Sequence, residues 1–148
     1  MLHPVKKALL FIFLLIALMQ LIGIEHTNPP VNPEAELKAP ETIMSLLKKS
    51  CYDCHSNETV WPAYAAVAPA SFFVVSHVND GRKALNFSDW KNIPDEIKKR
   101  RLQRSIQTLH NGMMPLASYL WLHEEAELSM EERKALAAWF NTELKPFE

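Results

Sequence analysis

The strongest constraint on this chain is the pentapeptide Cys51-Tyr52-Asp53-Cys54-His55, which holds the only two cysteines in 148 residues. Two cysteines separated by two residues and followed by histidine form the pattern to which c-type haem is attached. Thiols at this spacing on one turn can each add to a haem vinyl group, and the adjacent imidazole can ligate the iron. We therefore predict one covalent haem c on Cys51 and Cys54, with His55 as the proximal iron ligand.

Other uses of two closely spaced cysteines fit the sequence less well. A redox dithiol of the thioredoxin type belongs to a βαβ unit, and no alternating strand pattern is visible. A structural zinc site needs four ligands, usually with a second pair at close spacing. The other histidines after the linker, His77, His110 and His123, do not form such a pair, and no cysteine is left. A short disulfide would leave the adjacent histidine without a role.

The N-terminus carries an apolar run over residues 8–24, interrupted only by Gln20. As a helix this run would be roughly 25 Å long, at about 1.5 Å per residue, which is at the short end for a membrane span. We interpret residues 1–25 as an uncleaved signal anchor. A cleavable signal peptide is the alternative, but no A-x-A site follows the run.

The charges beside this run predict which way the chain crosses the membrane. Lys6 and Lys7 precede the apolar residues and favour a cytoplasmic N-terminus. The rest of the chain would then lie on the outer side of the bacterial inner membrane, which is where haem is attached to such a motif. Both features therefore predict a single-pass protein with a periplasmic haem domain.

Two further segments follow the predicted anchor. Residues 26–40 contain four prolines and predict an extended, partly stiff linker. Residues 41–148 have the length of one small domain, in which a bound haem would supply much of the core. The formal net charge of the chain is −1, with basic and acidic residues nearly balanced. We therefore expect no nucleic-acid binding.

Helical periodicity dominates this domain and predicts an all-α fold. Residues 41–49 form a helix candidate that leads into the cysteine motif, and residues 72–78 favour a helical turn over a short strand. A proline and two acids at residues 94–96 start another helix, which should end at Gly112. A capping box at residues 129–132 starts the last one, with Leu136, Trp139 and Phe140 on its apolar face. We expect this face to contact the first helix of the domain.

The loop Gly112-Met113-Met114-Pro115 precedes the last helix. A methionine followed by proline at this place is similar to the distal iron ligand of cytochromes c. A thioether is a soft, neutral ligand that favours ferrous iron and raises the reduction potential. The alternative is that both methionines fill gaps in the core. We predict Met114 as the ligand, because Pro115 disfavours the helical conformation at the residue before it.

The exported domain resembles the bacterial haem-binding domain family related to cytochrome c. This resemblance implies a monohaem c-type module with a cytochrome c-like helical fold, often anchored in the membrane. It covers nearly all of the chain after the linker. The residues that carry it are Cys51-Tyr52-Asp53-Cys54-His55-Ser56-Asn57, Trp61-Pro62, Pro69-Ala70-Ser71, His77-Val78-Asn79-Asp80-Gly81-Arg82, Leu85-Asn86-Phe87-Ser88-Asp89-Trp90, Met114-Pro115 and Tyr119-Leu120-Trp121-Leu122-His123.

Two further residues are weaker candidates for the haem site. Arg82 has a guanidinium that could pair with a haem propionate, and a solvated surface arginine is the alternative. His77 would be the sixth iron ligand if the methionine loop does not close, although a structural or surface role suits it better.

These features favour an electron carrier over an enzyme. Iron ligated by His55 and Met114 would have no open position for a substrate, and we expect single electrons to pass to redox partner proteins. The alternative is a haem sensor or a peroxidase-like haem enzyme with a displaceable sixth ligand. Tandem methionines and nearby histidines leave that alternative open.

Overall fold

The computed structural model describes residues 3–147, which form helices and loops and contain no strand. The prediction of an all-α chain is therefore confirmed. Residues 1–2 of the predicted anchor and residue 148 of the predicted haem domain lie outside the described range. The α-helices are α1 Pro4–Met19, α2 Glu41–Ser50, α3 Tyr52–His55, α4 Ala70–Ala84, α5 Asp95–His110, α6 Ala117–Leu120 and α7 Met130–Leu144, and the 3-10 helices are η1 Ala63–Ala66, η2 Phe87–Asn92, η3 Glu124–Ala126 and η4 Lys145–Phe147.

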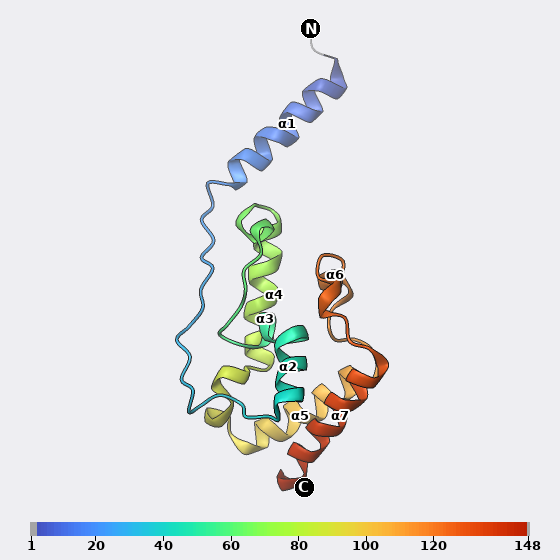
Figure 1. Ribbon diagram of the computed structural model, residues 1–148. Helices are drawn as coiled ribbons and strands as arrows, with labels where there is room; N and C mark the ends of the chain where they lie inside the picture. The colour runs from blue at the N-terminus through green and yellow to red at the C-terminus, as the bar shows by residue number, and fades with distance from the viewer. Residues whose placement is uncertain (1–2, 148) are drawn as a thin grey trace.

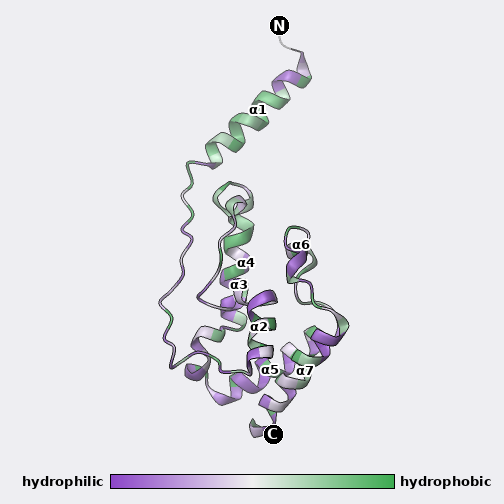
Figure 2. Cartoon of the chain, viewed as in Figure 1, coloured by the Kyte–Doolittle hydropathy of each residue, from purple (hydrophilic) through white to green (hydrophobic). Residues whose placement is uncertain are grey.

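Helix α1 stands apart from the other helices (Figure 1) and is largely apolar (Figure 2). It ends before the apolar run does, and the side chain of Gln20 then exchanges two hydrogen bonds of 3.0 Å with the backbone of Ala68. Among residues 3–147, no helix combines the length and the apolar character that crossing a membrane requires. Membrane attachment through this segment stays a prediction.

The predicted linker is extended, as expected, and runs along one side of the domain before it enters α2 (Figure 1). Its last part packs into the domain. The backbone N–H of Leu37 donates to the carbonyl of Phe87 at 2.8 Å, and that of Lys91 donates to Ala35 at 2.9 Å. The side chains of Ala35 and Leu37 are both buried, and only 2% of Leu37 is exposed. Residues 35–37 therefore belong to the packed structure rather than to a free tether.

Helices α5, α7 and α2 surround the main core. In each helix the apolar residues are spaced three and four positions apart, so they share one face. The apolar faces of the three helices pack against one another. Leu47 of α2 and Leu136 of α7 have no exposed surface, and Leu102 of α5 is 2% exposed. The buried members of this core are Leu37, Leu47, Tyr52, Leu85, Phe87, Trp90, Ile93, Leu102, Leu109, Leu128, Leu136, Ala137, Phe140 and Leu144.

The predicted contact between the first and last helices of the domain is confirmed. Leu47, Leu136 and Phe140 lie in one core cluster, and Lys49 of α2 forms an ion pair with Glu132 of α7 at 2.9 Å. Trp139 is only partly buried against this core, because α7 turns its most buried side toward α5, with which it has its most extensive contact.

Local signals set the ends of the helices as predicted. Ser129 and Glu132 form a reciprocal capping box at the start of α7. Helix α5 begins after Pro94, and Gly112 follows its end with a φ of 65°, a conformation that favours glycine. Residues 72–78 form part of the longer helix α4, so the prediction of a helical turn there rather than a strand is confirmed.

Candidate haem-binding site

The cysteine motif lies where α2 gives way to the single turn α3. The N–H of Cys51 donates to the carbonyl of Leu47 at 2.8 Å, and the N–H of His55 donates to the carbonyl of Cys51 at 2.9 Å. Ser56 closes the turn, because its hydroxyl donates to the carbonyl of Tyr52 at 2.8 Å. The turn therefore presents two thiols and one imidazole from a short, well-bonded stretch of backbone.

The imidazole of His55 has its tautomer fixed by the backbone of α4. Its Nδ1 lies 3.0 Å from the carbonyl oxygens of Gly81 and Leu85. A carbonyl can only accept a hydrogen bond, so Nδ1 must carry the hydrogen and Nε2 keeps its lone pair. Burial lowers the pKa of His55, which favours the neutral ring. Histidines that ligate metals are typically held by such a bond from the other ring nitrogen.

The largest cavity beside the motif has a volume of about 620 Å³. Cys51, His55 and Met114 all line it, so the structure brings together one predicted thiol and both predicted iron ligands. Apolar walls come from η2, α5, α7 and the loop segments beside them. They include Leu85, Phe87, Ile97, Leu109, Pro115 and Phe140.

The two methionines of the loop have different surroundings. Met114 is partly buried and lines the large cavity, whereas Met113 is 60% exposed and does not line it. The carbonyl of Met114 accepts a hydrogen bond from Nη1 of Arg133, which ties the loop to α7. Ligation of iron by Met114 rather than Met113 stays a prediction.

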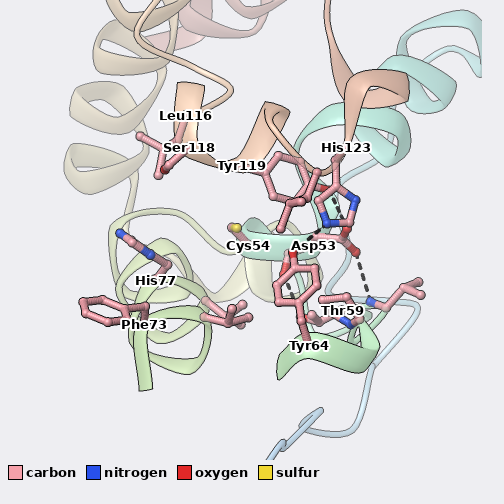
Figure 3. Close-up of a pocket in the computed structure, with 15 residues that line it drawn as sticks. Asp53, Cys54, Thr59, Tyr64, Phe73, His77, Leu116, Ser118, Tyr119 and His123 are labelled. Atoms are coloured by element: carbon pink, nitrogen blue, oxygen red, sulfur yellow. Dashed lines mark hydrogen bonds between the residues drawn. The ribbon is translucent and has the colours of Figure 1, made fainter. Parts of the chain in front are cut away.

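The second thiol, Cys54, lines a neighbouring cavity of about 280 Å³ (Figure 3). His77 and Phe73 of α4 lie on one side of it and Tyr119 and His123 on another, as Figure 3 shows. The two cysteines of this turn therefore line two different cavities.

Both cysteines are free thiols. Burial raises the pKa of Cys51 to about 12, and burial also raises the pKa of Cys54 to about 11. Both groups are consequently protonated at neutral pH. Among residues 3–147 no cluster of three or more histidines, cysteines or acids is suited to hold a metal ion, so the zinc alternative has no ligand set there.

The guanidinium of Arg82 is held by four hydrogen bonds to nearby residues. Its guanidinium donates to the carbonyls of Ser56 and Thr27, each at 2.7 Å, and to side-chain oxygens of Asn28 and Thr59, each at 2.8 Å. It lines neither cavity. A contact with a haem propionate stays a prediction, and it would have to replace some of these bonds.

The remaining histidines lie away from the large cavity. His77 is exposed and lines the smaller one. His123 is held by the hydroxyl of Tyr64 at 2.8 Å and by the carboxylate of Glu125 at 3.1 Å. His110 is an exposed residue at the end of α5. None of the three lines the cavity that contains His55 and Met114.

Sequence reasoning gave no role to several residues of the site. Gly81 and Leu85 appeared only as parts of family motifs, and their carbonyls orient His55. Arg100, Arg101 and Arg104 of α5 also line the large cavity. The available signal was the basic run at residues 98–104, whose charges the acidic residues elsewhere balance.

Gly81 of α4 also lies close against the backbone of Cys54 in α3, and its substitution should destabilise the site. A Cβ built there would lie 3.0 Å from both the carbonyl carbon and the Cβ of Cys54, and closer still to the carbonyl oxygen. Since backbone cannot move aside cheaply, we expect Gly81→Ala to lower the free energy of unfolding by about 1–3 kcal/mol. Chemical denaturation would measure this change.

Gly23 offers the matched control for that substitution. No atom lies within 4 Å of a Cβ built there, so Gly23→Ala should leave the unfolding free energy nearly unchanged. Equal stability of the two variants would show that the contact between α3 and α4 yields easily.

The large cavity fits a haem on three counts. It joins an imidazole with a free Nε2 to a thioether, it is walled by apolar side chains, and a protonated thiol stands at its edge. Comparison with known protein families also indicates haem binding. Residues 14–142 match the model of a family described as a haem-binding domain. No curated protein and no solved structure gives a significant match.

Proposed function

The chain belongs to the haem-binding domain family, and we propose that it is a membrane-anchored, periplasmic one-electron carrier with a single covalent haem c. The observation that carries this proposal is that His55 and Met114 line one cavity together with Cys51. Bound there, a haem would supply reversible one-electron chemistry between ferric and ferrous iron.

The two thiols would hold the cofactor through thioether bonds. Each S–H would add across one vinyl C=C bond, so that sulfur bonds to one carbon and the hydrogen goes to the other. No oxidant or reductant is consumed in this addition. Because Cys54 lines the neighbouring cavity, the proposal requires that both cavities serve as one crevice around the haem edge.

The protein would supply both axial ligands to the iron. His55 is oriented by two backbone carbonyls, so its free Nε2 is the ligating atom. The Met114 thioether would occupy the sixth position and favour the ferrous state. If both ligands came from the protein, peroxide or oxygen would find no open site on the iron, and the haem would act as an electron carrier rather than as a catalytic centre.

Helix α1 supports the anchor part of the proposal. Its large apolar side chains are exposed, with Phe11 at 67% and Phe13 at 68%. Lys6 and Lys7 lie at its start and favour a cytoplasmic N-terminus. The haem domain would then face redox partners on the outer side of the membrane.

One experiment on membranes tests the anchor and the carrier function together. Membranes from bacteria that express the full chain with haem-maturation proteins should retain a haem-stained band after washes with high salt and alkaline carbonate. In redox titration this haem should follow a one-electron curve, and the reduced form should not bind carbon monoxide at neutral pH. The physical reason is that α1 is held by apolar contact and both axial positions are filled.

Each part of that experiment has its own contrary outcome. Release of the haem-stained chain by salt alone would refute the anchor. Rapid carbon monoxide binding by the wild-type protein would favour the sensor or enzyme instead. Replacing residues 1–25 with a cleavable secretion signal provides the control, because the haem domain should still be exported and loaded with haem but should move to the soluble fraction with an unchanged spectrum.

A further inference from the structure

Helix α5 brings three arginines to the wall of the large cavity. Arg100, Arg101 and Arg104 line it, and Lys83 at the end of α4 adds a fourth basic side chain. No aspartate or glutamate lines this cavity within the described residues. The chain as a whole carries a formal charge of −1, so the positive charge here is a local concentration.

Arg100 and Arg104 have no partner for their charge in the part of the chain that the structure describes. Both are exposed, and the arginine hydrogen bonds among the described residues come from Arg82, Arg101 and Arg133 instead. No ion pair engages either guanidinium there. Two nearby lysines, by contrast, have acidic partners. Lys98 pairs with Asp95 at 3.2 Å, and Lys83 pairs with Asp80 at 3.1 Å. Like charges four positions apart on a helix repel each other, so an anion bound between Arg100 and Arg104 would relieve that repulsion.

Most of the other residues that line the same cavity are apolar, with Phe87, Leu109 and Phe140 among them. A ligand that suits both parts has an apolar body and carboxylates at one edge. Guanidinium groups bind carboxylates with two parallel hydrogen bonds, which lysine cannot reproduce. Haem has this chemistry, because its two propionates stand on one side of an apolar macrocycle.

We propose that Arg100 and Arg104 bind the haem propionates, an inference that rests on the proposed haem site. Arg101 holds this part of α5 against α4, because its Nη2 donates to the carbonyl of Lys83 at 3.0 Å. This assignment replaces Arg82, whose guanidinium already donates four hydrogen bonds elsewhere. The pair of arginines sets both the orientation of the macrocycle and its electrostatic surroundings.

Two consequences follow for the bound cofactor. Positive charge near the iron favours the reduced form, which carries one positive charge fewer, so these arginines raise the reduction potential. They also fix the carboxylates in a defined hydrogen-bonding state. Loss of either guanidinium should therefore lower the midpoint potential and shift the infrared bands of the propionates.

The test uses the full haem-loaded protein. Arg100→Gln and Arg104→Gln should each lower the midpoint potential, and the double variant should lower it further. Redox-induced infrared difference spectra should show shifted propionate carboxylate bands. Arg100→Lys keeps the charge but not the forked geometry, so it should restore much of the potential and leave the infrared shift.

Lys99→Gln is the matched control, because it removes one positive charge from the same helix at a residue that does not line the cavity. Its potential and infrared bands should resemble those of the wild type. If the arginine variants behave like Lys99→Gln while haem stays covalently attached, the assignment of the propionates is wrong and the proposed function survives. If the wild type itself attaches no haem, the proposed function fails and this inference fails with it.

Discussion

Replacing both Cys51 and Cys54 with alanine should abolish covalent haem attachment completely. Each thioether depends on one of these sulfurs, and the chain contains no other cysteine that could substitute. We expect each single variant to keep one thioether and a smaller yield of attached haem. Haem staining of denaturing gels, extraction with acidic acetone and the mass of the intact chain would each measure this loss.

Ser118→Ala is the control for these variants. Ser118 lines the smaller cavity beside Cys54 but carries no sulfur, so this change should leave attachment intact. Haem that extracts freely from the wild-type chain would remove the basis of the proposal, because the motif would then serve some other purpose. Circular dichroism of the double variant separates loss of attachment from loss of folding.

Local features of the sequence predicted the helices well. The capping box of Ser129 and Glu132, the start at Pro94 and the stop at Gly112 each depend on residues within one turn. Their physics therefore does not depend on the rest of the fold. The turn that carries Cys51, Cys54 and His55 was predictable for the same reason.

Contacts between distant segments were not predictable in this way. Leu37 and Phe87, fifty residues apart, are joined by a backbone hydrogen bond, and the end of α1 coincides with two hydrogen bonds exchanged between Gln20 and Ala68. Prolines in residues 26–40 indicated an extended chain, which is correct. They could not indicate that one end of this chain would be packed against the domain.

The same distinction between local signals and long-range contacts applies to the candidate site. Cys51 and His55 follow from a local motif, and Met114 follows from its place in a loop. Arg82 was the candidate for the propionates because its type suits a carboxylate. The fold engages it in four hydrogen bonds and places α5 at the cavity. The packing that brings α5 to the cavity could not be read from residue types, and a propionate contact of Arg82 stays a prediction.

The sixth iron ligand decides between an electron carrier and a catalyst, and the second large effect should appear at Met114. Replacing Met114 with alanine would remove the thioether from the cavity that contains His55. We expect the variant to bind carbon monoxide when reduced and to have a lower reduction potential, because a ligand that favours ferrous iron is lost. The far-red charge-transfer band from sulfur to iron should also disappear. Absorption spectra and redox titration measure all three effects.

Met113 and His77 supply the discriminating controls for that variant. Met113 is 60% exposed and does not line the large cavity, so Met113→Ala should change neither the potential nor carbon monoxide binding. If His77→Ala produces the effects expected of Met114→Ala, the iron has two histidine ligands and its potential should be much lower. If no variant matters and the wild type already binds carbon monoxide, the sixth position is open, and the site is then built for a ligand or substrate rather than for electron transfer alone.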